Sequence, residues 1–160
     1  MIALLWGALA GGLGLVWLTV ESMFQGEGAV ATTSTTALWL IIGPIAVVGA
    51  MVHRRRTVES YPYGAAFLTG LATATTAAVS LLCVWLLYVV FLNTEFFPQM
   101  LESVANDSRS AGDNEQVVKV RVTGAALMFS SPAFYLISFF IPLFSGAVAA
   151  LIAAIGVRRK

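Results

Sequence analysis

The chain has 160 residues, of which 59% are hydrophobic and only 11% are charged, and its formal net charge is +1. Soluble domains are about half apolar and about one quarter charged, so this composition excludes an ordinary water-soluble domain and requires lipid around the chain. The small net charge also argues against nucleic acid as an electrostatic partner.

The first apolar segment is predicted to span the membrane over about residues 2–20 and ends at Glu21. Twenty helical residues with a rise of about 1.5 Å each cover about 30 Å, the thickness of the hydrocarbon layer. Small residues recur in it at repeated four-residue spacing, which lets membrane helices approach closely. The helix-contact residues assigned to this stripe are Gly7, Gly11 and Gly14. No basic residue precedes the segment, so we expect an uncleaved span rather than a signal peptide.

A polar connection containing Glu27 leads to a second predicted span over about residues 33–52. Its apolar run, Ala37 to Val52, is short for a span. The threonines and serine before it extend the run, because their hydroxyls can bond back to the helix. Pro44 lies near the middle and removes one backbone hydrogen bond, so we expect a kink there. A kinked helix can line a transport path, although a kink more often serves packing.

Three arginines, Arg54, Arg55 and Arg56, follow the second span directly after His53. A basic block next to a span is the strongest orientation signal in a membrane sequence, and it predicts a cytoplasmic loop. The arginine side chains can also meet anionic lipid headgroups, at about 1 kcal/mol each near the surface. His53 is the only histidine, and we expect a hydrated interfacial side chain. Ligation of a pigment or metal by this single histidine is the alternative.

The third predicted span covers about residues 64–92, inside a stretch from Ser60 to Thr94 that has no ionisable group apart from tyrosine and cysteine. Such a stretch is too long for a soluble core helix and fits a bilayer. Four hydroxyl residues share one face of it at three- and four-residue spacing, and form a polar stripe of Thr69, Thr73, Thr76 and Ser80. Two interpretations of the stripe stay open: hydrogen bonding between helices, or the lining of a polar pathway.

Residues 93–131 form the only long segment predicted outside the membrane, on the extracytoplasmic side. After a cap at Asn93 or Thr94, we expect a short helix containing Pro98 to Val104. Its apolar side chains are expected to lie on the membrane surface. They are Phe96, Phe97, Met100 and Leu101.

The second half of this segment has an ambiguous pattern. Residues 118–122 alternate like a strand, but a single strand would have no partner to bond. We therefore predict a second amphipathic helix from about Asn114 to Phe129. The acidic side chains here lack calcium-loop spacing and are expected to be solvated.

The last predicted span covers about residues 132–157 and contains Pro142, where a second kink is expected. A second small-residue stripe, which consists of Gly146, Ala150 and Ala154, is expected to pack against the glycines of the first span. The chain ends in a second basic block of Arg158, Arg159 and Lys160.

Charge placement predicts the topology. Four spans with both termini in the cytoplasm place six Lys and Arg residues inside and three outside, in accord with the positive-inside rule. The sequence therefore predicts an all-α polytopic membrane protein. It forms a single transmembrane domain of four helices over residues 1–160, with one or two short amphipathic helices between the third and fourth spans.

Several stretches carry a family resemblance. They are the glycine-bearing first segment, the basic loop, the entry YPYGAAFLTG, the exit VVFLNTEFFPQMLESV and the ending PLFSGAVAALIAAIGVRRK. Over most of its length the chain resembles the domain-of-unknown-function 4199 family. The resemblance implies a small integral protein of the bacterial inner membrane. That family is uncharacterised, so the resemblance implies no activity or ligand.

The predicted hydrocarbon core contains no Asp, Glu, Lys, Arg or His. Proton relays, ion-coupled carriers and intramembrane catalysts usually keep an ionisable group at that depth. The sequence also has no nucleophile–base pair, metal-ligand cluster or phosphate-binding glycine loop, and its only cysteine, Cys83, cannot form a disulfide within one chain. We therefore expect no catalytic activity, no cofactor and no metal.

The preferred hypothesis for function is a structural or accessory subunit of a membrane complex, or a homo-oligomer. Its expected partners are membrane lipid and other membrane subunits or copies of itself. The alternative is a small transporter or channel, which Pro44, Pro142 and the threonine stripe motivate.

Overall fold

The structure is a computed structural model that describes residues 1–24, 33–128 and 131–158. Its described residues form six α-helices and one π-helical turn, with no β-strand, which confirms the prediction of an all-α chain. The elements are α1 (Ile2–Phe24), α2 (Thr33–Thr57), α3 (Tyr63–Leu87), the π-helix η1 (Tyr88–Leu92), α4 (Phe96–Ser110), α5 (Glu115–Met128) and α6 (Ser131–Val157).

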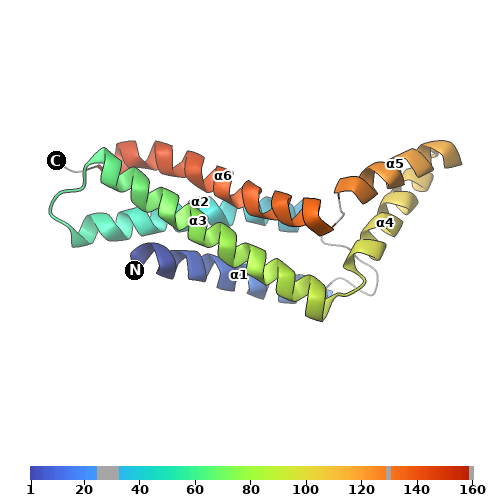
Figure 1. Ribbon diagram of the computed structural model, residues 1–160, viewed down its shortest axis with the longest axis horizontal. Helices are drawn as coiled ribbons and strands as arrows, with labels where there is room; N and C mark the ends of the chain where they lie inside the picture. Colours follow the sequence, from blue (N-terminus) through green and yellow to red (C-terminus); the bar gives the residue numbers. More distant parts are fainter. Residues whose placement is uncertain (25–32, 129–130, 159–160) are drawn as a thin grey trace.

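The long helices α1, α2, α3 and α6 pack lengthwise into an elongated bundle, and α4 and α5 form a hairpin beyond one end of it (Figure 1). The start of α1, the α2–α3 connection and the end of α6 lie together at the opposite end. We call these two ends the hairpin end and the basic end, because the latter carries Arg54, Arg55, Arg56 and Arg158. Helix α3 contacts α1, α2 and α6 and is the central element of the bundle.

Three helices are long and apolar enough to cross a membrane in the part of the chain that the structure describes. They are α1 over Ile2–Glu21, α3 with η1 over Tyr63–Leu92, and α6 over Pro132–Val157. The sequence predicts four such helices, and α2 is not among those found. Threonine and serine occupy the first turn of α2 and three arginines its last, which leaves a shorter apolar stretch between them.

Large apolar side chains remain exposed along the outer faces of these helices. Leu4 on α1, Leu68 on α3 and Phe144 on α6 are 64%, 64% and 73% exposed. Contiguous apolar surface of this kind is rare on soluble monomers. Together with the three long apolar helices, it indicates a membrane protein.

An aromatic cluster closes the hairpin end of the bundle. Trp85 on α3 lies 5.3 Å from the ring of Phe96 and 5.2 Å from that of Phe134, between ring centroids. Such spacings are typical of favourable aromatic pairs. Phe96 is only 1% exposed, and Phe97 and Met100 pack against the same cluster. The prediction that the apolar side chains of α4 lie on the membrane surface is wrong for Phe96, Phe97 and Met100, because they pack onto the bundle end, and it stays a prediction for Leu101.

The α4–α5 hairpin is held by polar contacts at its turn. Gly112 has a φ of +83°, the left-handed conformation that favours glycine, between the two helices. Beside it, the Ser108 hydroxyl donates to Asp113 Oδ2 at 2.6 Å, and Arg121 Nη2 lies 3.1 Å from the same oxygen. Asn114 Oδ1 accepts the Val117 N–H at 3.0 Å, which caps α5. The helix predicted from about Asn114 to Phe129 is thus confirmed against the strand alternative over Glu115–Met128, and Phe129 lies outside the described residues.

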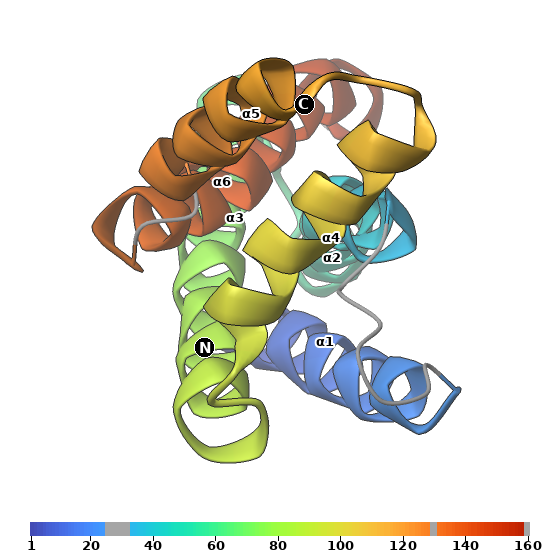
Figure 2. The ribbon, with the colours of Figure 1, turned by 90° about the vertical axis from the view of Figure 1, so that its right-hand side faces the viewer.

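Figure 2 looks along the bundle from the hairpin end and shows α4 crossing in front of the long helices. In this view α5 returns toward the start of α6. Pro44 and Pro142 both lie inside uninterrupted helices, and the kinks expected at them stay predictions. Glu27 of the predicted polar connection lies outside the described residues.

Candidate functional site

The three threonines of the hydroxyl stripe of α3 are bonded to backbone carbonyl groups. Thr69 donates to the Ala65 carbonyl and Thr73 to the Thr69 carbonyl, each at 2.8 Å within the same helix. Both threonines are buried. These bonds satisfy the hydroxyl protons locally, which is the usual arrangement for threonine in a membrane helix.

Thr76 differs because it also reaches a second helix. Its Oγ1 lies 2.9 Å from the carbonyl oxygen of Ala3 on α1, in addition to carbonyl oxygens of its own helix. A hydroxyl that bridges two helices supports the first of the two interpretations of the stripe, hydrogen bonding between helices. Ser80, one turn further along α3, lies against Gly11 of α1.

The small-residue stripe of α1 packs on α3, over the same hydroxyl residues. A Cβ added at Gly7 would overlap the Thr76 side chain, and one at Gly11 would lie 2.7 Å from Ser80 Cβ. At Gly14 the added atom would lie 2.7 Å from Cδ2 of Leu81. At Gly7 and Gly11 only glycine permits this approach of the two helices, whereas at Gly14 the flexible end of Leu81 could move aside.

The second small-residue stripe also packs on α3, from the side of α6. A Cβ added at Gly146 would lie 2.8 Å from that of Ala74, and one added at Gly70 would lie 2.5 Å from that of Ala150. Ala154 is buried in a cluster at the basic end. The expectation that this stripe faces the glycines of α1 is wrong, because α3 separates the two helices and offers a small face to each.

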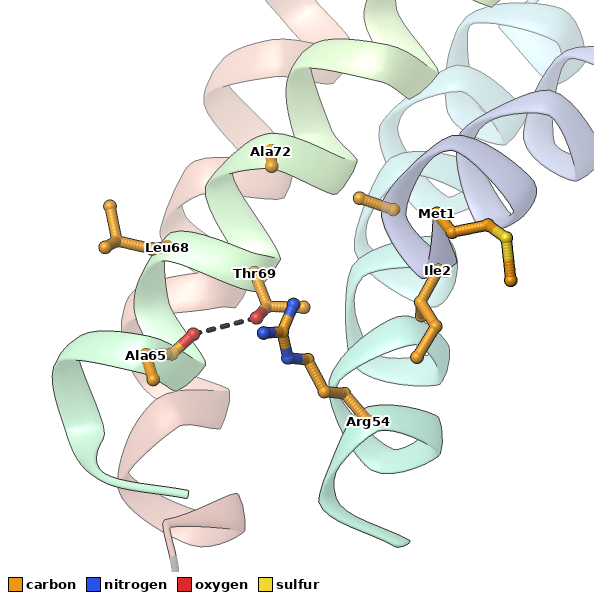
Figure 3. Close-up of a pocket in the computed structure, with 8 residues that line it drawn as sticks. Met1, Ile2, Arg54, Ala65, Leu68, Thr69 and Ala72 are labelled. Atoms are coloured by element: carbon orange, nitrogen blue, oxygen red, sulfur yellow. Dashed lines mark hydrogen bonds between the residues drawn. The ribbon is translucent and has the colours of Figure 1, made fainter. Parts of the chain in front are cut away.

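A pocket of about 270 Å³ opens at the basic end between α1, α2 and α3. Arg54 from α2 and Thr69 from α3 are its polar side chains, and the other side chains that line it are apolar, among them Ile2, Leu68 and Ala72. Figure 3 shows the Arg54 side chain extending from α2 toward Thr69. We call this the Arg54 pocket.

A second pocket of about 590 Å³ lies between α1 and α2, lined by Trp6, Gly49, His53 and Arg56 among others. Trp6 Nε1 donates to His53 Nδ1 at 3.3 Å, so this imidazole nitrogen acts as an acceptor. A Cβ at Gly49 would overlap the Trp6 ring, so glycine lets the indole lie against α2. His53 is thus an exposed hydrogen-bonded side chain at the basic end.

The arginines of the basic block have different surroundings. Arg54 lines one pocket, Arg56 lines the other, and Arg55 lines neither. All three are exposed, and none forms an ion pair with a carboxylate in the described ranges, where the ion pairs belong to the hairpin. Arg158 is exposed at the same end of the bundle. Arg159 and Lys160 lie outside the described residues.

Sequence reasoning missed how α1 takes part in this site. The first turn of α1 carries no charge or polar side chain, yet it forms a wall of the Arg54 pocket and accepts the Thr76 bond. Trp6 was likewise missed, although a tryptophan one turn and a half inside an apolar segment is a common interfacial signal.

The comparisons with known proteins identify a family and no ligand. A family model described as "Protein of unknown function (DUF4199)" matches residues 5–159. No curated protein and no solved structure matches the chain. The matched range contains Arg54, Thr69 and the whole hairpin, and it begins after the first turn of α1.

Proposed function

Since the chain belongs to the DUF4199 family of unknown function, we propose its role from its geometry: a non-catalytic accessory subunit of a membrane complex. In this proposal the protein lies in the bacterial inner membrane with both termini in the cytoplasm. Its bundle crosses the bilayer, and its hairpin end faces the outside and contacts a partner subunit.

The arrangement of the helices supports α2 as a fourth crossing. Helices α1 and α3 both start at the basic end and run toward the hairpin end (Figure 1). If both cross the membrane, the chain has to return between them, and α2 is the segment that returns. Val47, Ala50 and Met51 of α2 are fully buried within the bundle, so packing rather than lipid contact covers much of this less apolar helix.

The exposed apolar surface of α5 is the observation that carries the accessory role. Val120 and Leu127 are 72% and 73% exposed, and Met128 is 59% exposed, on a helix outside the apolar spans. Exposed apolar side chains that project into water are unfavourable, and they mark surfaces that another protein covers. The turn contacts of Asp113 hold the hairpin in place before any partner binds.

The transporter alternative has less support from the geometry. The hydroxyls of Thr69, Thr73 and Thr76 are bonded to carbonyl oxygens, and glycines of α1 close over the stripe. A polar path along this face would need an open space that runs along the whole stripe, but only Thr69 lines one of the two pockets, and Thr76 and Ser80 are covered by Gly7 and Gly11. Flux through liposomes that contain the unmodified protein, abolished by Thr76→Val, would restore this alternative.

Co-purification from native membrane tests the accessory role. The protein is solubilised gently, its mass is measured, and bound proteins are identified. We expect a complex larger than one protomer that Val120→Glu disrupts, because the new charge would be buried without a partner. Gln116→Glu, at an exposed position of the same helix, is the matched control and should leave the complex intact. A stable lone protomer from native membrane would contradict the proposal.

A further inference from the structure

We propose that the Arg54 pocket binds the phosphate group of an anionic membrane lipid, with Arg54 as the cation that holds it. This inference requires only that the bundle lies in a membrane, and it is independent of the accessory role. The proposed binding takes place in one pocket with named lining residues. It is distinct from the general attraction of lipid headgroups to a basic protein surface.

The charge of the pocket selects an anion. Arg54 extends into it, no carboxylate lines it, and no carboxylate of the described residues pairs with Arg54 (Figure 3). The first turn of α1 forms another wall of the pocket. Two oxygens of a phosphate can accept from the guanidinium in the bidentate geometry that suits arginine.

The hydroxyl of Thr69 fits the same assignment. Its proton is donated to the Ala65 carbonyl at 2.8 Å, so its oxygen presents lone pairs to the pocket. An acceptor at this point favours a guanidinium beside it, and Figure 3 shows Arg54 directed toward Thr69.

The apolar walls favour a lipid over a soluble phosphate. Ile2, Leu68 and Ala72 surround the cation, and Leu68 is 64% exposed on the outer face of α3. A lipid can place its phosphate on Arg54 and its acyl chain over these side chains. A free phosphate would leave the same walls uncovered. The volume of about 270 Å³ lies just below the range of about 300–1,000 Å³ of small-molecule pockets, which suits a headgroup.

Lipid binding to the full-length protein in detergent tests the proposal. The delipidated protein is titrated with phosphatidylglycerol, with phosphatidylcholine and with inorganic phosphate, and bound lipid is counted by native mass spectrometry. We expect saturable binding of phosphatidylglycerol, weaker binding of phosphatidylcholine, and no competition from inorganic phosphate at equal concentration. Competition by inorganic phosphate with equal affinity would assign the pocket to a soluble anion and overturn the lipid assignment.

Two variants with matched controls locate the lipid. Loss of any surface arginine lowers lipid attraction by about five-fold. Arg54→Gln should weaken phosphatidylglycerol binding about ten-fold more than Arg55→Gln, because only Arg54 lines the pocket and loses a charge-assisted hydrogen bond. Equal effects of the two substitutions would overturn the proposal.

Ala72→Phe keeps every charge but fills the apolar wall. It should also weaken phosphatidylglycerol binding, while circular dichroism shows the same helix content as the unmodified protein. Unchanged binding in this variant would place the lipid outside the pocket and contradict the assignment.

Discussion

At Gly7, α1 approaches α3 so closely that an added Cβ would overlap Thr76 and lie 2.9 Å from its carbonyl carbon. Thr76 is β-branched, and the atoms in the way are near its backbone, so the neighbour cannot simply rotate aside. Gly12 on the same helix has nothing within 4 Å of the equivalent position. Glycine is therefore required for the close helix contact at position 7, whereas at position 12 there is space for a side chain.

Gly7→Ala is predicted to destabilise the protein. The overlap with Thr76 should cost about 1–3 kcal/mol through overpacking, which exceeds the gain of up to about 1 kcal/mol from the better helix propensity of alanine. Thermal unfolding in detergent measures the difference. Gly12→Ala is the control and should be neutral or slightly stabilising. An equal effect of both substitutions would show that Gly7 is not at a helix contact.

At the scale of the elements, Thr76 links α3 to the first turn of α1 through the Ala3 carbonyl. The neighbouring Thr75 donates to Leu71 within its own helix and is exposed. A comparison of Thr76 with Thr75 therefore distinguishes the contribution of a hydrogen bond between two helices from that of a hydrogen bond within one helix.

Thr76→Val is predicted to lower the free energy of unfolding by about 1 kcal/mol, because a hydrogen bond between membrane helices contributes about that much. Thr75→Val should change it by no more than a few tenths of that amount. Both substitutions keep the side-chain shape, and unfolding in detergent compares them. If Thr75→Val proved as costly as Thr76→Val, the contact with α1 would contribute nothing specific.

The stability of the hairpin is expected to depend more on Asp113 than on Glu115, the other acidic residue at the turn. Asp113 accepts from Ser108 and pairs with Arg121, and its side chain is 21% exposed. Glu115 pairs with Arg109, but these side chains are 78% and 52% exposed, a setting in which ion pairs contribute little.

Asp113→Ala is predicted to accelerate amide hydrogen exchange in α4 and α5, since it removes a charge-assisted hydrogen bond and leaves Ser108 without its acceptor. Glu115→Gln should leave the exchange rates close to those of the unmodified protein. Hydrogen exchange is measured by mass spectrometry on both variants. Equal exchange rates in Asp113→Ala and the unmodified protein would show that other contacts hold the turn.

At the scale of the whole molecule, the charges at the basic end and the hairpin end of the bundle predict the orientation of the protein in the membrane. The basic block and the end of α6 share one end of the bundle, and the hairpin lies at the other (Figure 1). Positive charge is retained on the cytoplasmic side of bacterial membranes. The topology proposed above follows from these two facts and is open to a direct test.

Single cysteines at Arg55→Cys, Arg158→Cys and Glu115→Cys, each in a Cys83→Ser background, are predicted to divide between the two sides of the membrane. A membrane-impermeant maleimide should label residue 115 in intact cells and residues 55 and 158 only after the membrane is opened. Labelling of residues 55 and 115 from the same side would mean that α3 does not cross as proposed.

Much of the fold could be predicted from local patterns. An apolar run of sufficient length specifies a helix in lipid because every backbone group has to be bonded within the segment. The absence of a partner strand correctly favoured a helix for α5. Of the candidate site, Arg54 and Thr69 were predicted singly, as a headgroup contact and as part of a stripe, without the pocket that joins them.

By itself, the sequence determined the helices, their apolar faces, and the gathering of positive charge into two blocks, because these depend on neighbours within a few residues. Only the tertiary structure decided that both small-residue stripes seat on α3 and that α4 packs its aromatic side chains onto the bundle. A helix face of small residues can pack against many other such faces, and an apolar helix face can be covered equally well by lipid or by protein. The choice among these partners depends on the shapes of segments far apart in the chain, which no local pattern contains.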